Sequence, residues 1–104
     1  MTLDEFIQSV KHEEEPPASL PEALKALWWA KKGDWDRAHQ ISQGVYSTSG
    51  SWVHAHLHRV EGDLANASFW YRRAEKRECS SELDIEWKEI SEYLLSQVNR
   101  VDSE

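Results

Sequence analysis

The chain has 104 residues, of which 39% are hydrophobic and 30% are charged, and its formal net charge is −7. These values fit one small folded domain, and no stretch approaches the ~20 consecutive apolar residues of a membrane helix. The negative total disfavours nucleic acids and anionic membranes as partners, because both repel an acidic protein.

Cysteine usage and the first residues bear on the compartment. Cys79 is the only cysteine, so no internal disulfide is possible. The start, MTLDEFIQSV, has acids where a secretory signal needs bases. We therefore expect a cytoplasmic protein.

The first third of the chain predicts two helices separated by a linker. Thr2 and Glu5 form a capping-box pattern before apolar residues at helical spacing, which predicts a helix over 3–11. The acidic Pro-Pro stretch KHEEEPPAS cannot continue a helix, so we expect residues 1–19 to be a short helix and linker before a single helical domain over 20–104. Ser19 is expected to cap the next helix, which runs to about Lys32.

The remaining helices follow from turn signals and apolar spacing. Asp34 is predicted to cap a helix that Gly44 ends, and Ser51 to cap the next one after the polar connection VYSTSGS. Asp63 opens a further helix, and Ser81 begins the last, which carries Leu83, Trp87, Ile90, Leu94 and Val98 at helical spacing. The glutamates of this last helix are expected to face solvent. The fold class is predicted to be all-α, since the chain outside these expected helices shows no convincing strand pattern.

Residues 26–41 and 55–70 form an internal repeat. Gly33-Asp34 and Gly62-Asp63 align with a period of 29 residues, and each unit reads as helix, Gly-Asp turn, helix. Neither unit can bury its apolar face alone, so we expect the two to stack.

This pattern resembles the tetratricopeptide repeat over roughly residues 20–77. The second unit matches the family pattern at Ala55, Gly62, Asp63, Ala67, Tyr71 and Ala74, and the first at Ala26, Trp29, Gly33, Asp34 and Ala38. The period is shorter than the ~34 residues of the family, Lys25 stands where a large apolar residue is usual, and no proline closes either unit. The resemblance implies two stacked helix-turn-helix repeats, with a short N-terminal helix and a C-terminal capping helix. The segment from Trp52 to Asp63 is also similar to that of small bacterial proteins carrying W-x-H-A-x-L-H-R-x-E-G-D, a likeness that implies no activity.

The segment GSWVHAHLHR places histidines at positions 54, 56 and 58. A strand would align all three on one face, but the repeat pairs this segment with a helix, so we expect a helix. His54 and His58 then share one face and His56 points away. Two interpretations remain open for His54 and His58: a hydrogen-bonded pair packed on tryptophan, or a metal or small-ligand site. A third ligand in the latter case would come from Cys79, His39 or Glu61.

Trp52, His56 and Arg59 form a second stripe on the same predicted helix. The repeat resemblance implies that these positions line a concave groove, together with Lys31 and Leu27 of the first unit. A tryptophan beside an arginine and a histidine is typical of a binding hot spot. We therefore expect an interaction module that binds a protein or peptide, or a second copy of itself as a homodimer.

The sequence supports no enzymatic assignment. We predict no catalytic residue, no cofactor and no assigned metal ligand, because no phosphate-binding glycine loop or general acid–base pair is recognisable. A basic face near Trp70 and Tyr71 suggests RNA, but the negative total and acidic flanks favour a solvated or ion-paired face. Its residues are Arg72, Arg73, Lys76 and Arg77.

Overall fold

The computed structural model describes residues 1–102, and all regular structure in that range is helical, which confirms the predicted all-α class. The helices are α1 Leu3–His12, α2 Glu22–Lys32, α3 Trp35–Gln43, α4 Thr48–Val60, α5 Leu64–Arg73 and α6 Leu83–Asp102. Within the described range, none of them has both the length and the apolar composition that crossing a bilayer requires.

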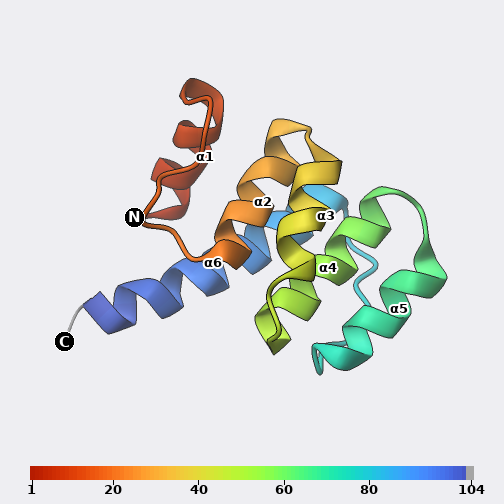
Figure 1. Ribbon diagram of the computed structural model, residues 1–104. Coiled ribbons are helices and arrows are strands. Elements are labelled where there is room, and N and C mark those ends of the chain that lie inside the picture. The colour runs from red at the N-terminus through yellow and green to blue at the C-terminus, as the bar shows by residue number, and fades with distance from the viewer. Residues whose placement is uncertain (103–104) are drawn as a thin grey trace.

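Helices α2 and α3 form one antiparallel hairpin, and α4 and α5 form another with the same turn (Figure 1). Gly33 and Gly62 adopt φ angles of +97° and +85°, a left-handed conformation that favours glycine because it has no Cβ. Asp34 and Asp63 then cap α3 and α5, and each side chain accepts from the backbone N–H three residues on, at 3.0 and 3.2 Å. The duplicated Gly-Asp signal of the sequence therefore folds into two turns of the same geometry.

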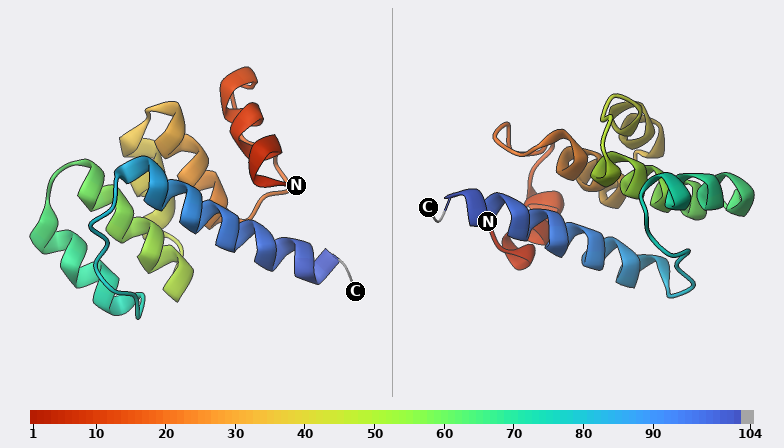
Figure 2. Two further views of the ribbon diagram at one scale, coloured as in Figure 1. Left: turned by 180° about the vertical axis from the view of Figure 1, so that it is seen from behind. Right: turned by 90° about the horizontal axis from the view of Figure 1, so that it is seen from below.

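Helix α4 lies at the centre of the molecule. It packs against α5 and α3 on one side and against α6 and α2 on another. Helix α6 runs across α2 and α4, and Figure 2 shows it as a separate layer beside the two hairpins. Nine consecutive α4 residues are buried in consequence, from Gly50 to His58. Every side chain in this stretch therefore faces another part of the protein.

The N-terminal helix shares the same core. Phe6 of α1 is fully buried and stacks on Trp87 of α6, with ring centroids 5.5 Å apart. Trp28 of α2 donates from Nε1 to Ser9 Oγ at 3.0 Å. Although the acidic Pro-Pro linker separates α1 from α2 in sequence, the helix packs on both α2 and α6.

Two helix starts among the first four differ from the prediction. Helix α2 begins after Pro21, which offers no side-chain cap, because Leu20 is held in a turn by its bond to Pro17 O at 3.2 Å. The Ser19 cap is therefore wrong. The Ser51 cap is also wrong, since α4 starts at Thr48 and Ser47 accepts from Gly50 N at 3.1 Å.

Close packing explains the early start of α4. A Cβ at Gly50 would stand 2.2 Å from Val45 O, so only glycine allows the chain to turn into the helix this tightly. At the other end of the molecule, α6 begins at Leu83 rather than directly after Ser81. The Ser81 hydroxyl instead lies 3.0 Å from Cys79 Sγ, so the predicted Ser81 start is wrong as well.

Candidate functional site

The three histidines of α4 lie on a helix, as predicted, and point to two different faces. His54 and His58 face α3 and α5, where their rings stack with centroids 4.8 Å apart. His56 faces α6 and bonds to Glu86. Because α4 is buried all round, each face is a distinct internal environment rather than a surface.

His39 of α3 joins His54 and His58 in one cluster. The nitrogens that the three rings offer all lie within 4.8 Å of one another. His39 Nε2 and His54 Nε2 are 2.9 Å apart, a hydrogen bond in which one nitrogen donates and the other accepts. Of the three additional ligands that the sequence offered, His39 is in the cluster and Cys79 is not, while Glu61 bonds to the outer side of His58.

Two tryptophans hold the cluster in place. Trp70 of α5 stacks on His54 with centroids 3.9 Å apart and planes 10° from parallel. Trp35 stacks on His39 at 4.6 Å and is itself fixed by a bond from its Nε1 to Leu57 O at 2.7 Å. The predicted packing of His54 on tryptophan is therefore observed.

Two rings of the cluster, those of His54 and His39, favour the neutral form. Burial, followed by the nearby His39 and His58, lowers the pKa of His54 to about 4 from its ordinary value of 6.5. Burial also lowers the pKa of His39, with His58 adding to the effect. A neutral imidazole offers a lone pair, which is the form that binds metal ions.

The other face of α4 carries a buried ionic network around Glu86. This carboxylate is 1% exposed and accepts from His56 Nδ1 at 2.7 Å, from Arg59 at 2.8 Å and from the Tyr71 hydroxyl. Burial acts to raise the pKa of Glu86, but the bonds from His56 and Tyr71 outweigh it and hold that pKa below its ordinary value. The expectation that all glutamates of the last helix face solvent is wrong for this residue.

The residues predicted to line a concave groove lie against α6. Trp52 packs on Tyr93, His56 and Arg59 bond to Glu86, and Trp87 Nε1 donates to Leu27 O at 2.8 Å. Lys31 pairs with Asp84 at the exposed edge. Helix α6 thus occupies the place expected for a partner, and a partner reaches these residues only where α6 moves away.

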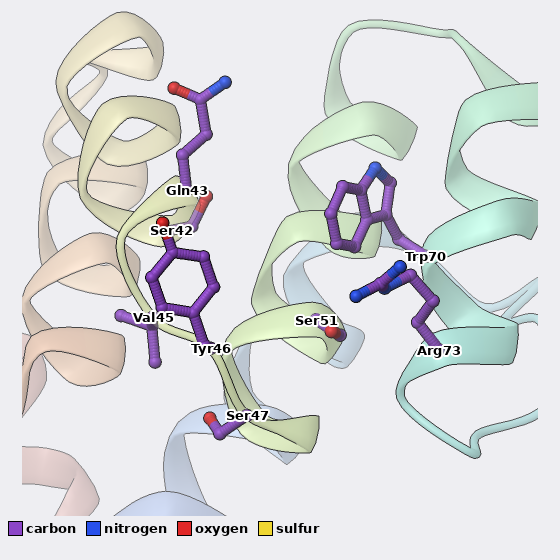
Figure 3. A pocket seen from close by; sticks show the side chains of 8 residues that line it. All are labelled: Ser42, Gln43, Val45, Tyr46, Ser47, Ser51, Trp70 and Arg73. Atoms are coloured by element: carbon purple, nitrogen blue, oxygen red, sulfur yellow. The ribbon is translucent and has the colours of Figure 1, made fainter.

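An open cleft lies elsewhere, between the α3–α4 connection and α5 (Figure 3). Its volume is about 450 Å³. Figure 3 shows Tyr46 on one rim and Trp70 and Arg73 on the other, with Ser51 between them. Tyr46 is 95% exposed, and Arg73 lies over the Trp70 ring at 5.3 Å. The remaining lining residues are Ser42, Gln43, Val45 and Ser47.

Sequence reasoning missed Glu86 and Tyr46 for different reasons. Glu86 stands four residues before Ile90 and eight before Leu94, so the helical register already places it on the buried stripe. Tyr46 carries no comparable signal, because its exposure depends on how the α3–α4 connection runs in space. Comparisons of the chain with protein-family models, with curated proteins and with solved structures gave no match.

Proposed function

We propose that this protein is a small helical module that binds an acidic segment of a partner protein in the cleft of Figure 3. The observation that carries the proposal is the exposure of Tyr46, 95%, directly across the cleft from Trp70 and Arg73. Tyrosine, tryptophan and arginine are the residue types that most often dominate binding energy at protein interfaces.

The cleft is rigid on one side and positively charged. Trp70 is stacked on His54, so its orientation is fixed before a partner arrives, which lowers the entropic cost of binding. Arg73 contributes a guanidinium that can bind a carboxylate through two hydrogen bonds. None of the described residues that line the cleft is an acid, so no negative charge there repels a partner carboxylate.

We favour a protein segment over other partners because of the charge of the chain and its proposed cellular location. The net charge of −7 opposes a nucleic-acid phosphate backbone at long range, whereas a short acidic segment interacts mainly with the local basic face. A cytoplasmic location is part of the proposal and rests on the single cysteine. The proposal assigns no catalytic role.

A random-peptide selection on the wild-type protein tests the proposal. We expect enriched peptides that combine acidic residues with an aromatic or large apolar residue, and we would measure their affinity by fluorescence anisotropy. Arg73→Glu should weaken a selected peptide by at least about tenfold, and Tyr46→Ala should weaken it as well.

Arg72→Glu is the matched control, because it makes the same charge change on the same helix outside the cleft lining. It should weaken binding by less than about threefold, as expected for a screened surface charge. The absence of any enriched sequence would contradict the proposal. Equal losses in the Arg72 and Arg73 variants would also contradict it, since they would indicate general electrostatics rather than a cleft.

A further inference from the structure

The His39–His54–His58 cluster supports an inference that is independent of partner binding. Its three members come from two helices of different hairpins and are 15 and four residues apart in sequence, so the packing of α3 against α4 brings them together. His54 and His58 are among the buried polar residues, and His39 is half-buried at the edge. The cluster is thus enclosed on one side and reachable on the other.

The spacing of the rings suits a tetrahedral metal ion. Zinc binds imidazole nitrogen at about 2.0–2.1 Å, which places two ligand nitrogens of a tetrahedron roughly 3.4 Å apart. The distance of 2.9 Å between His39 Nε2 and His54 Nε2, and the 4.8 Å that encloses all three nitrogens, bracket this value. Ring movements of at most about 0.7 Å on each side therefore convert the hydrogen-bonded cluster into a coordination site, by geometry from the same bond lengths.

The surroundings of the rings match those of metal-binding histidines. Such histidines commonly donate their second ring N–H to a carboxylate, which fixes the ring and leaves the other nitrogen for the metal. His58 Nδ1 bonds to Glu61 Oε2 at 2.9 Å, so Nε2 is the nitrogen that remains. The stacking of His54 on Trp70 and of His39 on Trp35 fixes the other two rings.

A purely structural role explains less of this arrangement. Packing needs buried imidazoles to be hydrogen-bonded, and the His39–His54 bond achieves that for one pair. It does not account for a third ring nitrogen, that of His58, within 4.8 Å of the other two. His56, on the opposite face, shows how this protein builds a structural histidine, with a buried carboxylate as its direct partner.

We infer that His39, His54 and His58 form a binding site for a divalent transition-metal ion, and that zinc is the ion the three imidazoles fit best. Three nitrogen ligands from the protein leave a fourth coordination position for water or for a ligand. Because His54 supports Trp70, metal binding also fixes one wall of the cleft of Figure 3.

Isothermal titration of the tag-free protein with Zn²⁺, after treatment with a chelator, tests the inference without any partner. We expect one equivalent to bind with micromolar or higher affinity and to raise Tm. His39→Gln should weaken binding by at least about 100-fold, and Glu61→Gln by about tenfold, since the outer carboxylate only orients its histidine.

Two matched controls separate the cluster from other donors. His12→Gln removes an exposed histidine of α1, and Cys79→Ser removes the only thiol. Both variants should bind zinc as the wild type does. Because His39 is half-buried, its replacement should leave the far-UV circular dichroism of the protein unchanged.

Cobalt(II) keeps the inference testable if a variant unfolds, since it needs only the wild type. Cobalt in a tetrahedral site gives intense visible absorption, and zinc should displace it at one equivalent. The absence of zinc binding and of this absorption would overturn the inference. Loss of binding in Cys79→Ser or His12→Gln to the same degree as in His39→Gln would overturn it too.

Discussion

His54 and His56 are two residues apart on α4 and are buried to a similar degree, 4% and 2% exposed, yet their surroundings are opposite. His56 meets a carboxylate, a guanidinium and a phenol, so its face of the helix is charge-balanced within the protein. His54 meets two further imidazoles and an indole, so its face brings three ring nitrogens close together. Burial alone therefore does not define the role of a histidine. The groups around the ring define it.

The largest expected effect on stability comes from replacing Glu86, the carboxylate that bonds to the His56 face of α4. Glu86→Gln removes the negative charge that pairs with Arg59 and the carboxylate oxygen that bonds to His56, and breaking a buried ion pair costs about 3–5 kcal/mol. We expect the free energy of unfolding, measured by urea denaturation, to fall by about 3 kcal/mol. Glu89→Gln on the exposed side of α6 is the control and should change it by less than about 0.5 kcal/mol. Equal effects of the two substitutions would show that the buried network around Glu86 does not stabilise the fold more than an exposed glutamate does.

Protonation of His54 should make the free energy of unfolding depend on pH. Because burial among His39 and His58 lowers the folded-state pKa of His54 to about 4, the unfolded chain binds a proton more readily below pH 6.5. The free energy of unfolding of the metal-free protein should therefore fall as pH drops from 6.5 towards 4, by roughly 1–3 kcal/mol. The lowered pKa of His39 acts in the same direction, opposed by Glu61 and Asp36.

His54→Gln separates this contribution from general acid effects. The variant keeps a polar side chain but cannot take up the proton, so its unfolding free energy should depend less on pH between 6.5 and 4. Urea titrations at several pH values in this range, with chelator present, provide the measurement. If the unfolding free energies of the variant and the wild type changed equally with pH, His54 would not be the group that takes up the proton.

The smallest expected effect concerns the second carboxylate that contacts an α4 histidine. The side chain of Glu61 is 39% exposed, so its bond to His58 is shared with water and contributes little to folding. Glu61→Gln should change the free energy of unfolding by less than about 1 kcal/mol, well below the effect of Glu86→Gln. A loss as large as that of Glu86→Gln would mean that the two faces stabilise the fold in the same way.

Local sequence signals predict which segments are helical better than they predict the residue at which each helix begins. The Gly-Asp pairs placed two turns, and the helical reading of GSWVHAHLHR followed from its pairing with the first repeat unit. The predicted start at Ser19 is wrong because Pro21 precedes α2, and the one at Ser51 because Ser47 caps α4 earlier, where Gly50 packs closely on Val45. The start at Ser81 is wrong because α6 begins at Leu83 and the Ser81 hydroxyl lies against Cys79 Sγ. Membership of the tetratricopeptide family stays a prediction.

The candidate site could be predicted only in part, because it depends on which helices meet. The spacing of His54 and His58 fixed their common face, but choosing His39 over Cys79 as the third member requires the packing of α3 on α4. The covering of Trp52, His56 and Arg59 by α6 likewise depends on a contact between distant segments. Side-chain spacing along one helix contains no information about such contacts.

Nuclear magnetic resonance of the imidazole nitrogens during a Zn²⁺ titration tests the difference between the two faces most directly. We expect the signals of His39, His54 and His58 to shift together and to saturate at one equivalent, while those of His56 keep their positions. Signals of the three clustered rings that stay unchanged, or a His56 signal that shifts with them, would contradict this expectation.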